Sequence, residues 1–300
     1  MISEAKSIKL IRIYSFICDQ YEENLKYHCQ RFSNNKNPKF TDQEIMTIYL
    51  FAIHEEQRLK LKDIHRYACD YLHTWFPNLG SYAAFCNRIN RLSSAFSQLG
   101  ESLLEKFRPV DCSKNQCLLD SMPIITCSGK RNSKVAKELT DKSYCASKNL
   151  WYYGLKLHAL SSRRLNVLPF PEQLLITAAS ENDLNVFKSA WQHKRDTEFY
   201  GDKIYIDTEM MTSMNQNCNS VLYTPIKETK GLSTTMKQFD KAFNDLYSKA
   251  VSSVRQPIES LFNWLIQKTD IQNASKVRST KGLLIHVFGK ISAAYLYLIF

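Results

Sequence analysis

The chain has 300 residues, of which 44% are hydrophobic and 12% aromatic, and its 40 Lys and Arg exceed its 29 Asp and Glu. This composition is sufficient for one large or two ordinary domains with a real core, and it excludes a globally disordered chain. The net charge of +11 is compatible with a polyanionic partner such as nucleic acid, although a basic protein without such a partner has the same balance.

The cysteines and the two ends of the chain indicate a cytoplasmic protein. The nine cysteines are odd in number and none lies in a C-x-x-C pair, so we expect reduced thiols rather than a disulfide framework or a zinc site. The N-terminal stretch carries charges within its apolar run and is a poor signal peptide. The apolar C-terminal stretch is interrupted by His286 and Lys290, which favours a packed helix over a membrane span.

Residues 1–107 have the pattern of a helical region. Thr41 and Glu44 form a capping-box pattern before a run with apolar residues at helical spacing. A second amphipathic stretch begins at residue 61 and ends at the sequence PNLGS. A third follows Ser81, a residue typical of N-caps, and continues to residue 107 as one predicted helix.

The second and third of these stretches, with a short glycine-containing turn between them, have the outline of a helix-turn-helix motif. The later helix carries Asn87, Arg88 and Arg91, whose side chains suit base edges and phosphates. An ordinary helical hairpin with a solvated polar face has the same outline. DNA binding by this segment is therefore a hypothesis.

The residue pattern of the sequence changes at residue 109. Short runs rich in β-branched and aromatic residues follow, with helical patterns between and after them. This alternation predicts a helical domain at residues 1–109 and an α/β domain at residues 110–300. The runs are QCLLD, WYYGLKLHAL, LLITAA, KIYID and VLYTPI.

Residues 128–164 are strongly basic, with nine Lys or Arg against two acids. Such a stretch is usually a solvated loop, but it also suits contact with a nucleic-acid backbone, for which Lys130 and Arg131 are candidates. Further on, Lys156 and His158 alternate with leucines, so they share one face of a predicted strand. If this face looks toward bound metal, Lys156 is a phosphate contact.

Three carboxylates are candidates for a metal site. Asp120 ends the apolar run Cys117–Leu119, where a buried charge requires a cationic partner. Asp202 follows Gly201, and Glu259 lies beside the apolar face of a late predicted helix. Carboxylates bind Mg²⁺, and two such ions can activate a nucleophile and stabilise the leaving oxygen in phosphodiester cleavage. Other aspartates are equally available by spacing alone.

Several ordered pieces of the sequence resemble the DDE transposases of bacterial insertion sequences. In that family the first Asp closes the first strand, the second follows a Gly, and the Glu follows an Arg by four positions. The matching residues are Asp120, Asp202, and the pair Arg255 and Glu259. The pieces that carry the resemblance are LLDSMPI, WYYGLKLH, GDKIYID, RQPIESLFNWL and KVRSTKGLLIHVFGKISAAYLYL.

The resemblance implies a ribonuclease-H-like α/β fold, in which a mixed five-stranded sheet is flanked by helices and preceded by an all-helical N-terminal DNA-binding domain. It implies that Asp120, Asp202 and Glu259 are catalytic and hold two Mg²⁺ or Mn²⁺ ions. The implied reaction is DNA cleavage at insertion-sequence ends, followed by transfer of the 3′-hydroxyl to target DNA. Lys203 and Arg255 are further expected phosphate contacts. The expected partners are terminal inverted repeats, target DNA and a second copy of the chain, since two ends must be brought together.

The sequence departs from the family pattern at three positions. Ile204 replaces the usual Gly after the G-D-K motif, and Ser252 and Ile266 stand where some relatives have Tyr and Lys. A DNA-hairpin step is therefore not assumed. Two alternatives stay open: a ribonuclease-H-like nuclease or resolvase without strand transfer, and a non-catalytic DNA-binding derivative.

Overall fold

The computed structural model of the chain describes residues 2–30, 38–130, 133–226 and 234–299. These residues form two compact units. The first unit comprises Met1–Phe107, Lys134–Ala136 and Leu265–Phe300, and the second comprises Arg108–Ser133 and Lys137–Trp264. The sequence assigns the whole of 110–300 to the sheet domain, whereas the C-terminal stretch belongs to the first unit by its contacts.

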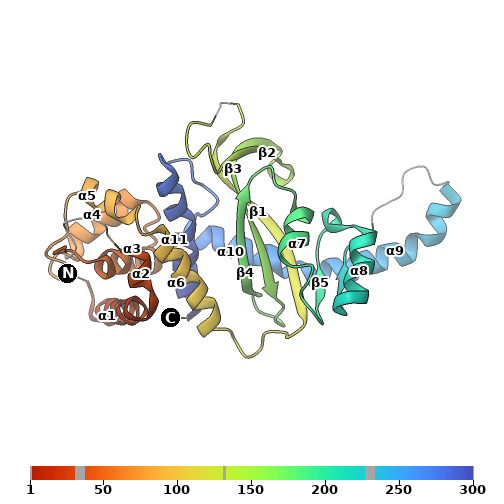
Figure 1. Cartoon of the computed structure of the whole chain (residues 1–300), viewed down its shortest axis with the longest axis horizontal. Coiled ribbons are helices and arrows are strands. Elements are labelled where there is room, and N and C mark those ends of the chain that lie inside the picture. Colours follow the sequence, from red (N-terminus) through yellow and green to blue (C-terminus); the bar gives the residue numbers. More distant parts are fainter. Residues whose placement is uncertain (1, 31–37, 131–132, 227–233, 300) are drawn as a thin grey trace. The chain divides into compact units, whose positions relative to one another are not determined.

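The first unit is helical. Its last helix, α11, packs against α3 and α6 (Figure 1), and buried apolar side chains such as Ile48, Phe96 and Leu296 line this core. The helices are α1 (Glu4–Gln20), α2 (Lys26–His28, after a π-helical turn at Tyr21–Leu25), α3 (Asp42–Glu56), α4 (Leu61–Tyr71), α5 (Tyr82–Ile89), α6 (Ser93–Lys106) and α11 (Thr280–Ile299).

Two of the predicted helix starts are confirmed. Thr41 Oγ1 accepts from the Glu44 backbone N–H at 3.2 Å, and the Glu44 carboxylate accepts from the Thr41 backbone N–H, which completes the capping box of α3. Ser81 Oγ accepts from the Ala84 N–H at 3.3 Å and caps α5. These caps depend on residues three apart in sequence, and that is why the sequence pattern reveals them.

The prediction of one helix from Ser81 to residue 107 is wrong. The chain leaves helical geometry after Ile89 and resumes it at Ser93, so that two helices replace one. At the break, the N–H groups of Arg91 and Leu92 bond to carbonyls three residues back, which tightens the turn. The apolar spacing continues through this break and therefore gives no sign of it.

α11 is the one helix among the described residues that is long and apolar enough to cross a membrane by length and composition. Most of its residues are nevertheless buried within the protein. Ser292 Oγ donates to the Phe96 carbonyl at 2.7 Å, and Tyr297 OH donates to the Ile53 carbonyl at 2.8 Å. These contacts with α6 and α3 are typical of a helix in a protein core.

The second unit is built on a mixed sheet. β1 pairs antiparallel with β3, and β3 pairs antiparallel with both β2 and β4. β5 runs parallel to β1, and β6 runs parallel to β5. The strands are β1 (Gln116–Ser128), β2 (Asp141–Cys145), β3 (Leu150–Ser162), β4 (Phe170–Ala178), β5 (Glu198–Tyr200) and β6 (Val221–Tyr223).

β2 and β4 share one edge of β3. β2 lies opposite Leu150–Gly154, and β4 lies opposite Leu155–Ser162. The six strands therefore occupy five positions across the sheet, in the order β4 (with β2), β3, β1, β5, β6. The predicted mixed sheet of a ribonuclease-H-like α/β fold is thereby confirmed, because antiparallel pairing on one side gives way to parallel pairing on the other.

Helices flank this sheet. α7 (Asp183–Ala190) and α8 (Thr208–Cys218) precede and follow β5, and parallel strands require such crossover connections. Their apolar side chains, including Phe187 and Met214, pack against Leu119 and Phe199 of the sheet. α9 (Thr234–Arg255) and α10 (Pro257–Thr269) follow β6, and Gln256 alone separates them. Proline at the start of α10 has no N–H to continue the helix from α9.

The run KIYID, at residues 203–207, is not a strand. The fourth strand position is filled by β5, which ends at Tyr200, and residues Lys203–Tyr205 form a 3₁₀ turn. Asp202 Oδ1 accepts from the Lys203 N–H at 2.7 Å at the start of this turn. The side chain of Asp207 then caps α8. Local capping by the two aspartates overrides the β propensity of the residues between them.

Candidate active site

Asp120 lies on β1, at the end of a fully buried run. Leu118 and Leu119 have no exposed surface, and the Asp120 side chain itself is 24% exposed. Its Oδ1 accepts from the Ser121 N–H at 2.8 Å, and its Oδ2 accepts from Arg255 Nη1 at 2.9 Å. In this structure the cationic partner that the sequence requires for Asp120 is therefore Arg255.

Arg255 joins two of the predicted site residues. It is the last residue of α9, and Glu259 lies in the first turn of α10, four positions later. While Nη1 donates to Asp120, Nη2 donates to Glu259 Oε1. The Arg255 side chain is 15% exposed, and its buried Nε has no acceptor among the described residues. The guanidinium thus bridges a strand carboxylate and a helix carboxylate.

Asp202 lies in the loop that follows β5, and its charge acts on the same group. Burial raises the pKa of Asp120 to about 6, Arg255 and the Ser121 N–H oppose this shift, and the negative charges of Glu259 and Asp202 add to it. Since Coulomb forces fall with distance, the three carboxylates of the predicted triad lie in one electrostatic neighbourhood.

Gly201 and Tyr205 fix the loop that carries Asp202. A Cβ added to Gly201 would lie 2.8 Å from Cδ2 of Tyr205, so the ring can pack this closely only against a glycine. Tyr205 is 1% exposed. Burial raises its pKa well above the usual range, and the charges of Asp183, Asp120 and Asp202 add to that shift. Tyr205 is a site residue that the sequence pattern did not reveal.

The donor set suits a divalent cation in its chemistry. Carboxylate oxygens are the ligands that Mg²⁺ and Mn²⁺ prefer. Burial disfavours the ionised form of Asp120, and a cation nearby favours that form. Across the described ranges, however, no three His, Cys, Asp or Glu side chains are grouped closely enough to hold a metal ion. Here the positive charge between Asp120 and Glu259 comes from Arg255 instead.

Lys156 and His158 lie on the opposite face of the sheet from Asp120. Asp120 pairs with Ala159, and Ser121 pairs with His158. Because paired residues share a face and successive residues alternate, Lys156 and His158 face the side that bears Ser121. The condition for Lys156 to be a phosphate contact beside the metals is therefore not met.

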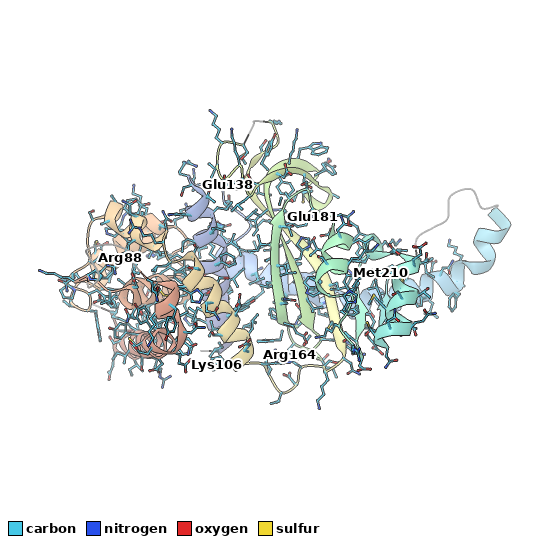
Figure 2. All side chains as sticks on the ribbon, viewed as in Figure 1. Arg88, Lys106, Glu138, Arg164, Glu181 and Met210 are labelled. Carbon is cyan, nitrogen blue, oxygen red and sulfur yellow. The ribbon has the colours of Figure 1, made fainter. Side chains whose placement is uncertain are left out.

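Both residues instead surround Asp183, the first residue of α7, which the sequence pattern missed. Lys156 Nζ donates to the carbonyl of Glu181, a residue labelled in Figure 2, at 2.7 Å and lies 3.5 Å from Asp183 Oδ2. His158 Nδ1 lies 3.1 Å from Asp183 Oδ1, and its Nε2 contacts Thr177 Oγ1 at 2.9 Å. Burial alone would raise the pKa of Asp183, but His158, Lys156 and Ser121 together hold it below its ordinary value.

Of the three candidate DNA contacts in the helix-turn-helix segment, one is paired with a buried acid and two are exposed. Arg88 (labelled in Figure 2) donates from Nε and Nη2 to Oδ1 of buried Asp42, at 3.1 and 3.0 Å. It therefore holds α5 to α3. Asn87 and Arg91 are exposed. Ten residues, 72–81, connect α4 to α5, which is longer than the three- to four-residue turn of a helix-turn-helix motif.

The remaining basic candidates lie near the sheet. Lys130 is exposed just after β1, and Lys203 is exposed next to Asp202. Arg131 lies outside the described residues. On the β2–β3 hairpin, Lys142 Nζ lies 5.4 Å from the ring centre of Trp151, which is 57% exposed. The basic stretch thus presents both charge and an aromatic surface.

Comparison with known protein families identifies the family of this chain. The family model described as a transposase DDE domain matches residues 112–280, which is more than half of the chain. Comparison with curated proteins and with solved structures finds no match. The matched range contains Asp120, Asp202 and Glu259, together with the whole mixed sheet. With its α/β sheet and this match, the chain belongs to the DDE transposase family.

Proposed function

We propose that the protein cleaves phosphodiester bonds at the ends of an insertion sequence and transfers the freed 3′-hydroxyl to target DNA. Asp120, Asp202 and Glu259 are the proposed catalytic, metal-binding residues. The observation that carries the proposal is the bridge from Arg255 to both Asp120 and Glu259, within a chain of the DDE transposase family. A carboxylate from the first strand and one from a late helix are thereby brought to one place.

The chemistry of the site follows from its charges. Two bound Mg²⁺ or Mn²⁺ ions would activate the attacking oxygen and stabilise the leaving one. Asp120, whose burial disfavours its ionised form, gains most from a cation nearby. Asp202 and Glu259 are more exposed and would complete the set from a loop and a helix. Both proposed reaction steps use the same three side chains.

Arg255 has two proposed roles. Its contacts with Asp120 and Glu259 hold the carboxylates near each other when no metal is bound. When a cation and DNA enter, its planar guanidinium is suited to bind a phosphate oxygen pair. A residue that first neutralises the acids and then contacts the substrate prevents the site from collapsing or repelling DNA.

The DNA partner is proposed to contact exposed basic side chains. Asn87, Arg91, Lys130 and Lys203 are exposed and have the chemistry for phosphate or base contact. Transposon ends are proposed to be paired by at least two copies of the chain. A phosphate-dominated interface predicts that DNA affinity falls steeply with salt.

A strand-transfer assay with the full chain tests the proposal. The substrate is a DNA fragment with both ends of the element that encodes the chain, together with a supercoiled target plasmid and Mg²⁺ or Mn²⁺. Cleavage at the ends and covalent joining to the plasmid are expected, and Asp120→Asn should abolish both. Cleavage without joining would replace the proposal with a nuclease or resolvase, and DNA binding without cleavage would replace it with a non-catalytic binding protein.

A further inference from the structure

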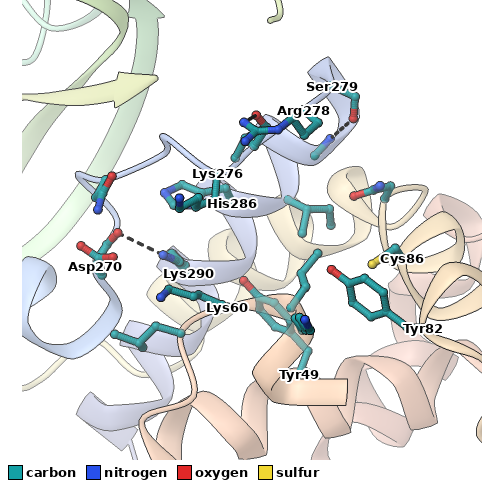
Figure 3. A pocket seen from close by; sticks show the side chains of 18 residues that line it. Tyr49, Lys60, Tyr82, Cys86, Asp270, Lys276, Arg278, Ser279, His286 and Lys290 are labelled. Carbon is teal, nitrogen blue, oxygen red and sulfur yellow. Dashed lines mark hydrogen bonds between the residues drawn. The ribbon is translucent and has the colours of Figure 1, made fainter. Parts of the chain in front are cut away.

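The first unit contains a pocket of about 540 Å³ that is separate from the carboxylate site. Its walls come from α3, from the start of α4, from α5, from the segment 270–279 and from the first half of α11. Figure 3 shows these side chains converging on one space, with Lys60, Lys276 and Lys290 gathered on one side and Tyr82 and Cys86 on the other. The volume is that of a small-molecule site and is too large for a single inorganic anion.

The pocket is strongly basic. Five cationic side chains line it, against one carboxylate, that of Asp270. In the part of the chain that the structure describes, none of the five forms an ion pair with an acid. Unpaired cations at close range repel one another, and a bound anion relieves that repulsion. The five are Lys60, Lys62, Lys276, Arg278 and Lys290.

Lys290 provides a buried donor at this pocket. Its side chain is 3% exposed, and its Nζ donates to the Asp270 carbonyl at 3.0 Å. An ammonium group has three N–H donors, and this is the one hydrogen bond that Lys290 makes among the described residues. Beside it, His286 Nε2 lies 2.8 Å from the carbonyl oxygen of Ile271. Burial lowers the pKa of Lys290 to about 8, and a phosphate in the pocket would favour its charged form.

The other side of the pocket is aromatic and apolar. Tyr82 is 43% exposed, and Tyr49, Leu61 and Ile285 add apolar surface. Asn90 also lines the pocket, and its buried Oδ1 accepts no hydrogen bond from any residue that the structure describes. A ligand that satisfies all of these groups carries negative charge, a flat ring and an N–H donor. A nucleotide has all three, whereas phosphate or polyphosphate lacks the ring and a fatty acid lacks the donor.

We infer that this pocket binds a nucleotide, with its phosphate among Lys60, Lys276 and Lys290 and its base against Tyr82 and Asn90. The nucleotide is either free or part of a DNA strand, since the same groups recognise both. This inference concerns a second site and does not depend on the proposed reaction at Asp120.

Cysteine footprinting on the full chain tests the inference, because Cys86 lines the pocket and exposed Cys69 does not. The alkylation rate of both thiols is followed by mass spectrometry with deoxyadenosine monophosphate, with a short single-stranded oligonucleotide, or with inorganic phosphate. A saturating nucleotide should slow alkylation of Cys86 by about tenfold or more, as expected for a buried contact. The rate at Cys69 should be unchanged.

The two nucleotide probes distinguish a free nucleotide from a nucleotide within a DNA strand. Protection by the mononucleotide assigns a free nucleotide, and protection by the oligonucleotide alone assigns a nucleotide of DNA. The variant Lys60→Ala with Lys276→Ala should weaken binding by about tenfold, as loss of charge-assisted hydrogen bonds does. Lys281→Ala, an exposed lysine outside the pocket, is the matched control and should bind as the wild type does. Protection of Cys86 by neither nucleotide probe, or equal protection by inorganic phosphate, would overturn the inference.

Discussion

Arg255 Nη1 donates to Asp120 Oδ2 at 2.9 Å across a sequence separation of 135 residues. The same guanidinium donates to Glu259. A strand in the middle of the sheet and the junction of two late helices are thus connected by one cation. This contact holds two of the three proposed catalytic acids, Asp120 and Glu259, close to one guanidinium.

Replacing Arg255 by alanine should raise the pKa of Asp120 further above 6. Arg255 opposes the upward shift that burial produces, so its removal leaves burial and the neighbouring acids unopposed. The carboxyl chemical shift of Asp120, followed by NMR through a pH titration of metal-free protein, reports this directly. Arg255→Lys keeps a charge and should give a smaller increase. A pKa for Asp120 that stays the same or falls in Arg255→Ala would show that the bridge does not govern this acid.

Asp120 should also affect stability in a pH-dependent way. Its pKa in the folded state, about 6, lies above the ordinary aspartate pKa of 3.8, so the folded state binds more protons between these two pH values. Stability from this group is therefore lost as the pH rises from about 4 to about 7, by roughly 2–3 kcal/mol. When the free energy of unfolding is measured with urea at each pH, Asp120→Asn should not show this loss of stability. Identical slopes for the variant and the wild type would contradict the assignment.

Arg88 and Arg91 should separate a structural role from a DNA-contact role. Arg88→Ala leaves buried Asp42 without this partner, and should lower the free energy of unfolding by about 3 kcal/mol. Arg91 is exposed, so Arg91→Ala should leave stability unchanged and weaken DNA binding. Thermal unfolding and DNA titration are measured on both variants. A stable Arg88→Ala protein with weakened DNA binding would restore Arg88 as a direct contact.

Lys290 should make the protein more stable at alkaline pH. Burial lowers its pKa to about 8 from the ordinary lysine pKa of 10.5, so the unfolded state binds more protons between these values. Stability therefore rises from pH 8 to pH 10.5, by up to about 3 kcal/mol. Lys290→Met removes the titrating group, and the difference between the two unfolding curves isolates its contribution. If the free energy of unfolding depends on pH in the same way in the wild type and in Lys290→Met, Lys290 does not have a lowered pKa in the folded protein.

Much of the fold could be predicted because its signals are local. The capping box at Thr41 and the cap at Ser81 depend on residues three apart, and strand runs such as those in β1 and β3 are marked by composition. The break after Ile89 has no local signal because apolar periodicity continues through it, and the 3₁₀ turn after Asp202 has none because its residues favour a strand. The packing of α11 with α3 and α6 depends on contacts about 200 residues apart, which no local pattern encodes.

Local sequence patterns name some residues of the candidate site and leave out others. The sequence pieces located Asp120, Asp202, Arg255 and Glu259, and the structure brings these residues into one electrostatic neighbourhood. The face of the sheet on which Lys156 lies depends on how β3 pairs with β1. The alternation of residues along a single strand does not determine this pairing. The pairing of Arg88 with Asp42 likewise depends on how α3 and α5 pack. The roles of these residues in catalysis and DNA binding stay predictions.

The most direct measurement is the cleavage and strand transfer of three matched variants, Asp120→Asn, Asp202→Asn and Glu259→Gln, with Mg²⁺ and paired element ends. Each variant removes one charge and keeps the shape of the side chain. Each should lose both reactions by about a hundred- to thousandfold, as expected when charge stabilisation of the transition state is removed, and each should still bind DNA. Wild-type rates of cleavage in any one of them would remove that residue from the catalytic set and contradict the three-carboxylate site.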